Sequence, residues 1–336
     1  FLKLPDWFNA IGGTDTQYPT ESYNESIKTM GDEKESIFLK AAKEVIDDQI
    51  ECGIDIVTDG EVRRENYIHY HCRHLQGIDF NKITKKIART GNYECWLPTI
   101  INKIEPKDSF LVHDWTVAQR FSVKPVKITI PGPMTITDTI ANKFYSSNKD
   151  LGQDLAKAIN NEIKNLVKAG CKFIQVDEPL FARKPKEAIE YGIKNLEKCF
   201  EDISNPDVEK ITHICCGYPD KLDAINYPKA PLDSYHQIAE LLDNSIIDSI
   251  SLEDAHRYND LSLLDKFTQS KVILGLIKIA SSEEETIIEI QKRVKDVLEH
   301  IDRDRLIAAP DCGLGHLPRE LAIKKLKTMV NAVKDI

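Results

Sequence analysis

The chain has 336 residues, of which 41% are hydrophobic and 29% are charged, and its formal net charge is −9. These values are typical of a globular protein with one large core, and the negative charge disfavours binding to nucleic acids or anionic membranes. The sequence has no run of about 18 apolar residues that would predict a membrane span, so we expect a cytoplasmic protein. Its eight cysteines lack the dense spacing of a small disulfide-bonded domain.

Short β-branched segments alternate along the chain with longer segments whose apolar residues recur at helical spacing. This alternation predicts parallel strands joined by crossover helices. The expected strands are Phe8–Ile11, Ile54–Val57, Val126–Ile130, Phe173–Val176, Ile211–Cys215, Ile247–Leu252, Val272–Ile277 and Leu306–Ala309. The expected helices are Glu33–Cys52, Gly152–Ala169, Lys186–Phe200, Ser234–Asn244, Ser282–His300 and Leu317–Val333. This number of strands predicts an α/β fold, a (β/α)₈ TIM barrel that spans residues 1–336 as a single domain.

The segment from about residue 63 to 124 departs from the alternation. It contains His69, His71, Cys72 and His74, which are metal-binding residue types but follow no regular strand or helix spacing. A long insertion after a strand usually belongs to the functional face of a domain. We expect it to form a lid or a contact with a neighbouring subunit, and the sequence permits a homo-oligomer without requiring one.

Residues suited to chemistry follow the expected strands at their carboxyl ends, where TIM barrels build their active sites. Six strands contribute such residues: Asp59-Gly60-Glu61, Pro131-Gly132-Pro133-Met134-Thr135, Asp177-Glu178-Pro179, His213-Ile214-Cys215-Cys216-Gly217, Glu253-Asp254 and Pro310-Asp311-Cys312-Gly313. We therefore expect the functional site at this rim.

Four of these residues predict a metal site. His213 and Cys215 are two positions apart, so their side chains point to the same face of an extended strand. Glu253 and Cys312, from two later strand ends, can complete a tetrahedral set. Sulfur and imidazole ligands favour Zn²⁺ over Mg²⁺ or Ca²⁺. A lone His-x-Cys pair is more often structural, so the prediction depends on Cys312 at a second strand end.

Carboxylates at the same rim predict a ligand-binding role. Glu61 and Asp177 can hold an amine or transfer protons. The alternative is that they accept hydrogen bonds from backbone N–H groups, and for Glu178, which precedes Pro179, the two interpretations stand equal.

With these residues assembled, the sequence resembles the C-terminal catalytic barrel of the cobalamin-independent methionine synthase family over nearly its whole length. The shared motifs are Asp59-Gly60-Glu61, Gly132-Pro133-Met134-Thr135, Gln175-Val176-Asp177-Glu178-Pro179, His213-Ile214-Cys215, Ser251-Leu252-Glu253 and Pro310-Asp311-Cys312-Gly313-Leu314. The resemblance implies zinc ligation by His213, Cys215, Glu253 and Cys312. It also implies that Asp177 and Glu61 hold the amino group and backbone of homocysteine, whose thiol accepts a methyl group to give methionine.

Several positions depart from the full-length members of that family, which have two barrels. Ile11-Gly12-Gly13 lacks a Ser, Thr139 stands where a Trp stacks on folate, and Ala280 stands where a His ends the seventh strand. The chain is also similar to the short, single-barrel relatives, which include epoxyalkane:coenzyme M transferase. The methyl donor is accordingly open among a folate, a methylated corrinoid protein and a small methyl compound.

Three hypotheses follow for the function. The first is zinc-dependent methyl transfer to homocysteine, forming methionine. The second is zinc-dependent alkyl transfer to another thiol, such as coenzyme M with an epoxide. The third is a barrel that binds zinc without catalysing a reaction, in which a closed four-ligand site would stabilise the fold.

Overall fold

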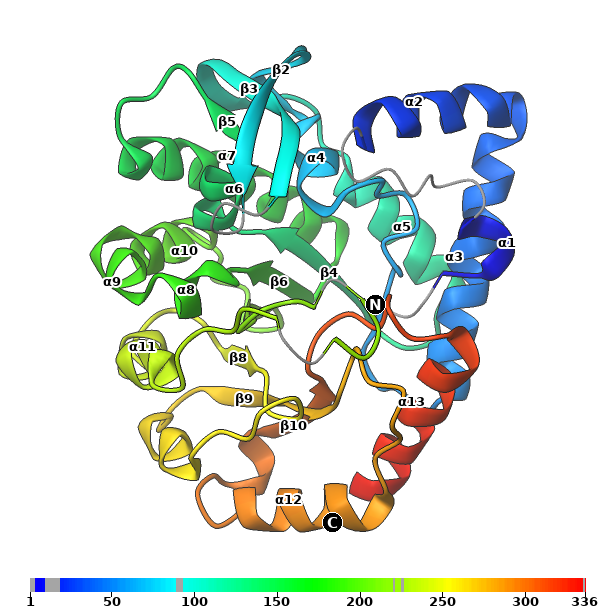
Figure 1. Cartoon of the computed structure of the whole chain (residues 1–336), viewed down its shortest axis with the longest axis vertical. Coiled ribbons are helices and arrows are strands. Elements are labelled where there is room, and N and C mark those ends of the chain that lie inside the picture. The colour runs from blue at the N-terminus through cyan, green and yellow to red at the C-terminus, as the bar shows by residue number, and fades with distance from the viewer. Residues whose placement is uncertain (1–3, 10–18, 89–92, 220, 225–226, 335) are drawn as a thin grey trace.

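The centre of the molecule is a curled parallel sheet with helices around its outside (Figure 1). The computed structural model describes residues 4–9, 19–88, 93–219, 221–224, 227–334 and 336. Its seven parallel strands follow the order β1-β4-β6-β7-β8-β9-β10. Their bounds are Val57–Thr58, Val126–Pro131, Phe173–Asp177, Glu209–Ile214, Ser249–Leu252, Lys271–Ile277 and Leu306–Pro310. Because all these strands run in one direction, their carboxyl ends meet at one rim.

Seven of the expected strands correspond to this sheet, but the first expected strand, Phe8–Ile11, is wrong where it can be compared. Phe8 and Asn9 belong to a short helix, α1 (Asp6–Asn9), and Ala10 and Ile11 lie outside the described residues. The amide of Phe8 donates to the carbonyl of Pro5 at 2.8 Å, which closes a helical turn. The ring of Phe8 packs against Phe38 of helix α3 (Lys34–Glu51). Docking on this helix therefore overrides the local strand pattern.

Helices connect the strands, as the alternation predicts. They are α2 (Pro19–Met30), α3 (Lys34–Glu51), α6 (Pro133–Thr139), α7 (Asn148–Ala169), α8 (Leu180–Arg183), α9 (Pro185–Glu187), α10 (Ile193–Cys199), α11 (Ser234–Asp243), α12 (Ile287–Val297) and α13 (Arg319–Val333). Short helical turns, mostly 3₁₀, lie at η1 (Gly31–Glu33), η2 (Ala188–Gly192, a π turn), η3 (Leu261–Lys266) and η4 (Arg303–Arg305).

Two expected helices differ from the structure. The expected helix Lys186–Phe200 is divided by the π turn η2, and the expected helix Ser282–His300 begins only at Ile287. Thr286 forms a capping box with Glu289 there, and such a box is a stronger start signal than the Ser and Glu residues that precede it.

The segment 63–124 contains regular structure that the sequence pattern did not predict. It contains α4 (Tyr67–Cys72), the antiparallel strands β2 (Leu75–Ala88) and β3 (Tyr93–Pro106), and α5 (Leu111–Phe121). With β5 (Ala141–Asn142), β2 and β3 form a second sheet that stands beside α4 (Figure 1).

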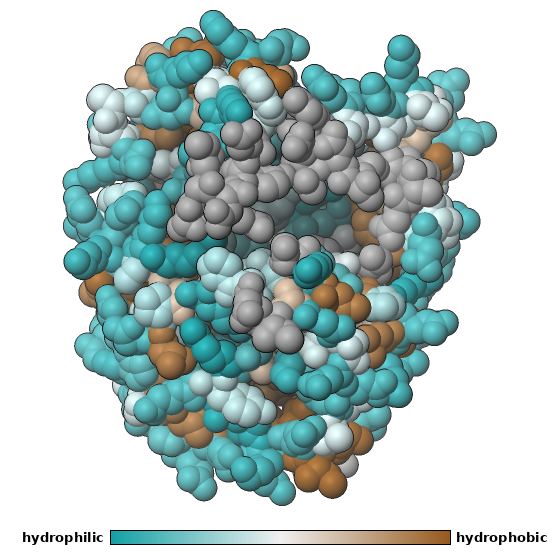
Figure 2. All heavy atoms as spheres, viewed as in Figure 1, coloured by the Kyte–Doolittle hydropathy of each residue, from teal (hydrophilic) through white to brown (hydrophobic). Residues whose placement is uncertain are grey.

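The core lies between the curled sheet and its helices. The cysteines Cys52, Cys171 and Cys199 are buried in this core, as expected for small apolar side chains. The face shown in Figure 2 is mostly hydrophilic and has a recess near its centre. None of the described helices is long and apolar enough to cross a membrane.

Candidate metal centre

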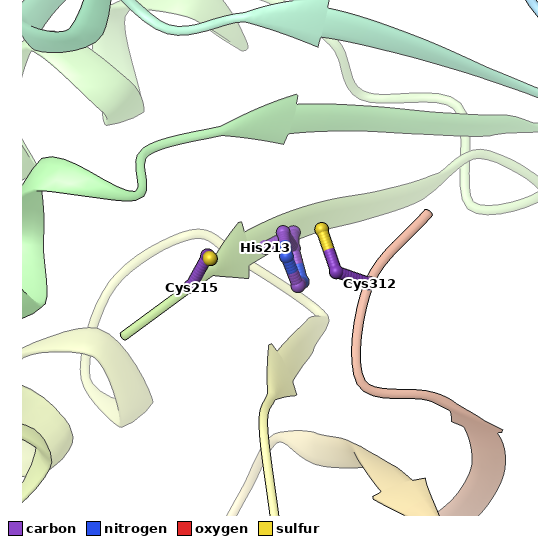
Figure 3. A group of neighbouring side chains, drawn as sticks. All are labelled: His213, Cys215 and Cys312. Atoms are coloured by element: carbon purple, nitrogen blue, oxygen red, sulfur yellow. The ribbon is translucent and has the colours of Figure 1, made fainter. Parts of the chain in front are cut away.

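The ends of two strands that are not neighbours in the sheet, β7 and β10, bring His213, Cys215 and Cys312 together. His213 lies in β7, Cys215 directly follows that strand, and Cys312 lies two residues beyond β10. One ligand atom from each residue lies within 4.8 Å of the others, and His213 and Cys215 are buried. Figure 3 shows the imidazole of His213 between the two sulfur atoms. Among the described residues, this is the only group of three or more His, Cys, Asp or Glu side chains that could hold one metal ion.

One of the two ring nitrogens of His213 has no hydrogen-bond partner among the described residues. Its Nδ1 lies 2.9 Å from the Ser251 hydroxyl of β8. Its Nε2 is buried and has no hydrogen-bond partner among the described residues. A buried polar nitrogen without a partner is costly. A metal-binding histidine usually has one nitrogen held by a neighbour and the other directed at the ion, so the donor set fits a metal.

The charges at these three residues are strongly coupled. Burial disfavours a charge on His213, but Cys312, Asp177 and Glu253 outweigh it and raise the pKa of the imidazole to about 9. The neighbouring Cys215 thiol, together with His213, lowers the pKa of Cys312 well below its usual range. The pKa of Cys215 is raised by Cys312 and by burial. Metal binding requires thiolates and a neutral imidazole, so an ion bound here would displace protons.

Glu253 lies at the edge of this cluster. Its Oε1 is 2.8 Å from the sulfur of Cys215, but its carboxylate is not among the groups that lie within 4.8 Å of one another. The predicted four-residue set is therefore assembled as three close donors and one carboxylate beside them. Burial raises the pKa of Glu253 to about 7.

Asp311 fixes the loop that carries Glu253. Its carboxylate accepts hydrogen bonds from the backbone amides of Asp254, Ala255 and His256, at 2.7 to 2.8 Å. The Nδ1 of His256 lies 2.8 Å from the same carboxylate. A Cβ at Gly275 of β9 would lie 1.9 Å from Asp311 Oδ1, so Asp311 occupies the space that a side chain at position 275 would need.

Glu61 is held in place by its backbone and by two donors. It has a φ of +56°, and the preceding Gly60 has a φ of +68°. A Cβ on Gly60 would lie 2.4 Å from Val45, so this tight turn requires glycine. The Oε1 of Glu61 accepts hydrogen bonds from Arg64 at 3.0 Å and from the Thr129 hydroxyl at 2.7 Å.

The adjacent carboxylates Asp177 and Glu178 have different surroundings. Asp177 accepts hydrogen bonds from the Tyr67 hydroxyl at 2.7 Å and from the Gln175 side-chain amide at 2.6 Å. Burial raises the pKa of Asp177, and His213 opposes this rise. Glu178 instead accepts hydrogen bonds from the backbone amides of Met134 and Thr135 and from the Thr135 hydroxyl. Of the two interpretations for Glu178, the structure therefore supports the one in which its carboxylate accepts backbone hydrogen bonds, here at the start of α6.

The histidines of the segment 63–124 do not assemble into a metal site within the described residues. His71 Nδ1 lies 3.0 Å from the carbonyl of Tyr67. His74 stacks on Phe110 with ring centroids 4.0 Å apart. Burial lowers the pKa values of His69 and His74 to about 4, which suits neutral rings in an apolar cluster.

The positions that depart from the full-length family pattern are occupied by small side chains. The Thr139 hydroxyl donates to the carbonyl of Thr135 at 2.6 Å, within α6. Ala280 is buried, and its carbonyl accepts from the amide of Asp223. Ile11-Gly12-Gly13 lies outside the described residues. A pocket of about 340 Å³ lies between α6 and the β2–β3 hairpin, and none of the six predicted site residues lines it.

Sequence reasoning missed the residues that hold the site residues in place. These supporting residues are Tyr67, Thr129, Gln175, Ser251 and Asp311. A signal was present for three of them, because Gln175 and Ser251 lie two positions before Asp177 and Glu253, and Asp311 directly precedes Cys312. Tyr67 gave no such signal, since it lies 110 residues from its partner Asp177.

Comparison with known proteins places the chain in a family. Residues 16–335 match the family described as Cobalamin-independent synthase, Catalytic domain. A methionine synthase of Saccharolobus solfataricus is 32% identical over 312 residues, which cover 92% of this chain and 87% of that protein. A methionine synthase of Sulfolobus acidocaldarius is 31% identical over 305 residues, covering 90% of this chain and 83% of that protein.

A solved structure agrees with these matches. The B12-independent methionine synthase from Shewanella sp. W3-18-1, solved in complex with selenomethionine, is 30% identical and superposes with a TM-score of 0.82. The match covers 91% of this chain and 89% of that one. The chain therefore belongs to the cobalamin-independent methionine synthase family, a family of methyltransferases.

Proposed function

We propose that this protein is a zinc-dependent methyltransferase that transfers a methyl group to the thiol of homocysteine and forms methionine. The observation that carries this proposal is the cluster of His213, Cys215 and Cys312, in which one ligand atom of each residue lies within 4.8 Å of the others. The buried Nε2 of His213 has no hydrogen-bond partner among the described residues, which leaves it free to bind an ion. An imidazole and two thiolates favour zinc over hard cations. Glu253 is the fourth ligand in this proposal, because its Oε1 already lies beside Cys215.

The chemistry follows from the physics of thiols. When bound, zinc would supply a positive charge that lowers the pKa of the substrate thiol from about 8.5, so that the nucleophilic thiolate forms at neutral pH. Asp177 and Glu61 would hold the amino group and backbone of homocysteine. Both carboxylates are fixed by hydrogen bonds, so they would orient the substrate without rearranging. The Shewanella relative was solved in complex with selenomethionine, an analogue of methionine, and this supports methionine as the product of the reaction.

The proposal extends to the fold. We infer a closed (β/α)₈ barrel formed by residues 1–336 as one domain, with residues 63–124 as an insertion after the second strand. The likeness to the Shewanella enzyme over 91% of the chain supports this architecture. In the insertion, Tyr67 contacts Asp177, which supports a role for the segment at the site.

The methyl donor is a folate, a methylated corrinoid protein or a small methyl compound. Thr139 supplies no aromatic ring for stacking, and its hydroxyl is bonded within α6. A folate donor therefore has the least support among the three.

Zinc content and X-ray absorption at the zinc edge test the proposal. The protein is measured alone and with homocysteine, coenzyme M or 2-mercaptoethanol. We expect one zinc per chain, and we expect homocysteine to replace a light-atom ligand with sulfur. The same change with coenzyme M alone would favour alkyl transfer to that thiol. The absence of zinc, or a shell that no thiol alters, would overturn the proposal.

Chelation separates the enzyme from a barrel that uses zinc only for stability. The core is made by the sheet and its helices, so circular dichroism should show a folded protein after zinc is removed. Unfolding on chelation would identify a structural site instead.

A further inference from the structure

Lys127 of β4 is connected to the predicted substrate carboxylate Asp177 through one side chain. Its ammonium donates to Gln175 Oε1 at 2.6 Å, and Gln175 Nε2 donates to Asp177 Oδ1 at 2.6 Å. Gln175 and Asp177 are 7% and 9% exposed. Polar groups that are buried to this extent are stabilised only when they form hydrogen bonds, so the contacts of Gln175 and Asp177 matter for their positions.

Lys127 fixes which end of the Gln175 amide faces which neighbour. A lysine ammonium has only donors, so it requires the amide oxygen. The amide nitrogen then faces Asp177, and the Tyr67 hydroxyl donates to the other carboxylate oxygen at 2.7 Å. Both oxygens of Asp177 therefore meet a donor, which holds the carboxylate in one orientation and favours its ionised form.

The charge of Lys127 is not used in an ion pair. Within the described part of the chain, the acceptor of its ammonium is the uncharged Gln175 amide. Lys271 of β9, also half-buried near the start of its strand, instead lies 2.9 Å from Glu209. Lys127 thus places a positive charge one side chain away from Asp177.

We propose that Lys127 is a positioning residue that acts through Gln175 to fix Asp177 for the amino group of the substrate. This inference rests on the proposed function, in which Asp177 binds the amine of homocysteine. Removing the ammonium leaves the buried oxygen of Gln175 without its donor, which loosens Gln175 and then Asp177. The effect should fall on recognition of the amine and not on recognition of the thiol.

Two thiols that differ only in the amine provide the test. Dissociation constants for homocysteine and for 4-sulfanylbutanoate, which lacks the amino group, are measured by calorimetry on the zinc-loaded protein. We expect Lys127→Met to weaken homocysteine binding about tenfold, the scale of one hydrogen bond to a charged group. Binding of 4-sulfanylbutanoate and the zinc content should stay unchanged.

Lys271→Met is the matched control, because it removes a similar lysine that contacts Glu209. It should leave the preference for homocysteine intact. A wild-type protein that prefers homocysteine, with a Lys127→Met variant that keeps this preference, would overturn the inference and leave the proposed function standing. A wild-type protein without any preference would overturn the amine-binding role of Asp177, and the inference with it.

Gln175→Met breaks the same connection at its second link and serves if Lys127→Met fails to fold. It should reduce the preference for homocysteine to a similar extent. The double variant should be no worse than the more affected single variant, because both changes cut one chain of contacts. Additive losses would contradict the inference.

Discussion

The two halves of the candidate site are prepared to different degrees. In the metal half, His213 has a buried nitrogen without a hydrogen-bond partner among the described residues, and it is grouped with the two sulfurs of Cys215 and Cys312. In the carboxylate half, Asp177 and Glu61 each accept hydrogen bonds from two side chains. The metal half thus offers donors that suit a cation, whereas the carboxylate half is assembled by the protein alone. We propose that an ion completes the first half and that the fold itself shapes the second.

The strongest way to break this comparison is to remove a metal donor. Cys312→Ala should abolish stoichiometric zinc binding and lower activity by more than about 100-fold, since changes beside a metal ligand alone cost about 10- to 100-fold. Zinc per chain is measured by mass spectrometry. Cys216→Ala, which removes the buried cysteine next to Cys215, should keep one zinc. If the Cys312→Ala variant still bound one zinc per chain, the metal would lie elsewhere.

The pH dependence of zinc affinity sharpens the description of the metal half. Without zinc, His213 has a pKa of about 9 and is therefore protonated below that pH. The pKa of Cys215 is raised, so it stays a thiol, whereas the pKa of Cys312 is lowered, so it is a thiolate. Zinc must therefore displace two protons between pH 7.5 and 9, and one above pH 9. The logarithm of affinity should rise with pH with a slope of about two, falling to about one. Competition with a chelator measures it, and a slope that stays constant through pH 9 would contradict the assignment.

The smallest expected effect tests the carboxylate half. Tyr67→Phe removes the donor to Asp177 Oδ2 and should weaken homocysteine binding by about 1 kcal/mol, roughly fivefold. Zinc content should not change. Tyr70→Phe, on the same helix, removes a hydrogen bond to Asp114 and should leave homocysteine binding as it is. Equal effects of the two variants would show that the helix, and not the contact with Asp177, matters.

The sequence predicted the strand ends better than the contacts between them. His213 and Cys312 are 99 residues apart in the chain (312 − 213), yet both were predicted for the site because parallel strands end at one rim. Glu253 was predicted as an equal member of the metal set, but the structure places its carboxylate beside Cys215 and outside the group of three close donors. Alternation along a strand determines a face and not a distance, so it could not resolve this difference.

Other features depend on contacts that no local pattern contains. The strand expected at Phe8 is part of a helix because Phe8 packs on α3. The hairpin of β2 and β3 was missed because its strands carry many lysines and other polar residues, which hide the alternation typical of strands. The donors to the two oxygens of Asp177 are Tyr67 and Gln175. This pairing is set by tertiary structure.

Gly275 sets a limit for anyone who would redesign this enzyme for other substrates. Any side chain at this position would displace Asp311, whose carboxylate holds the amides after Glu253 and whose backbone continues into Cys312. A single methyl group would therefore disturb two metal-ligand candidates without contacting either. Mutant libraries that randomise the strand ends should therefore leave residue 275 unchanged.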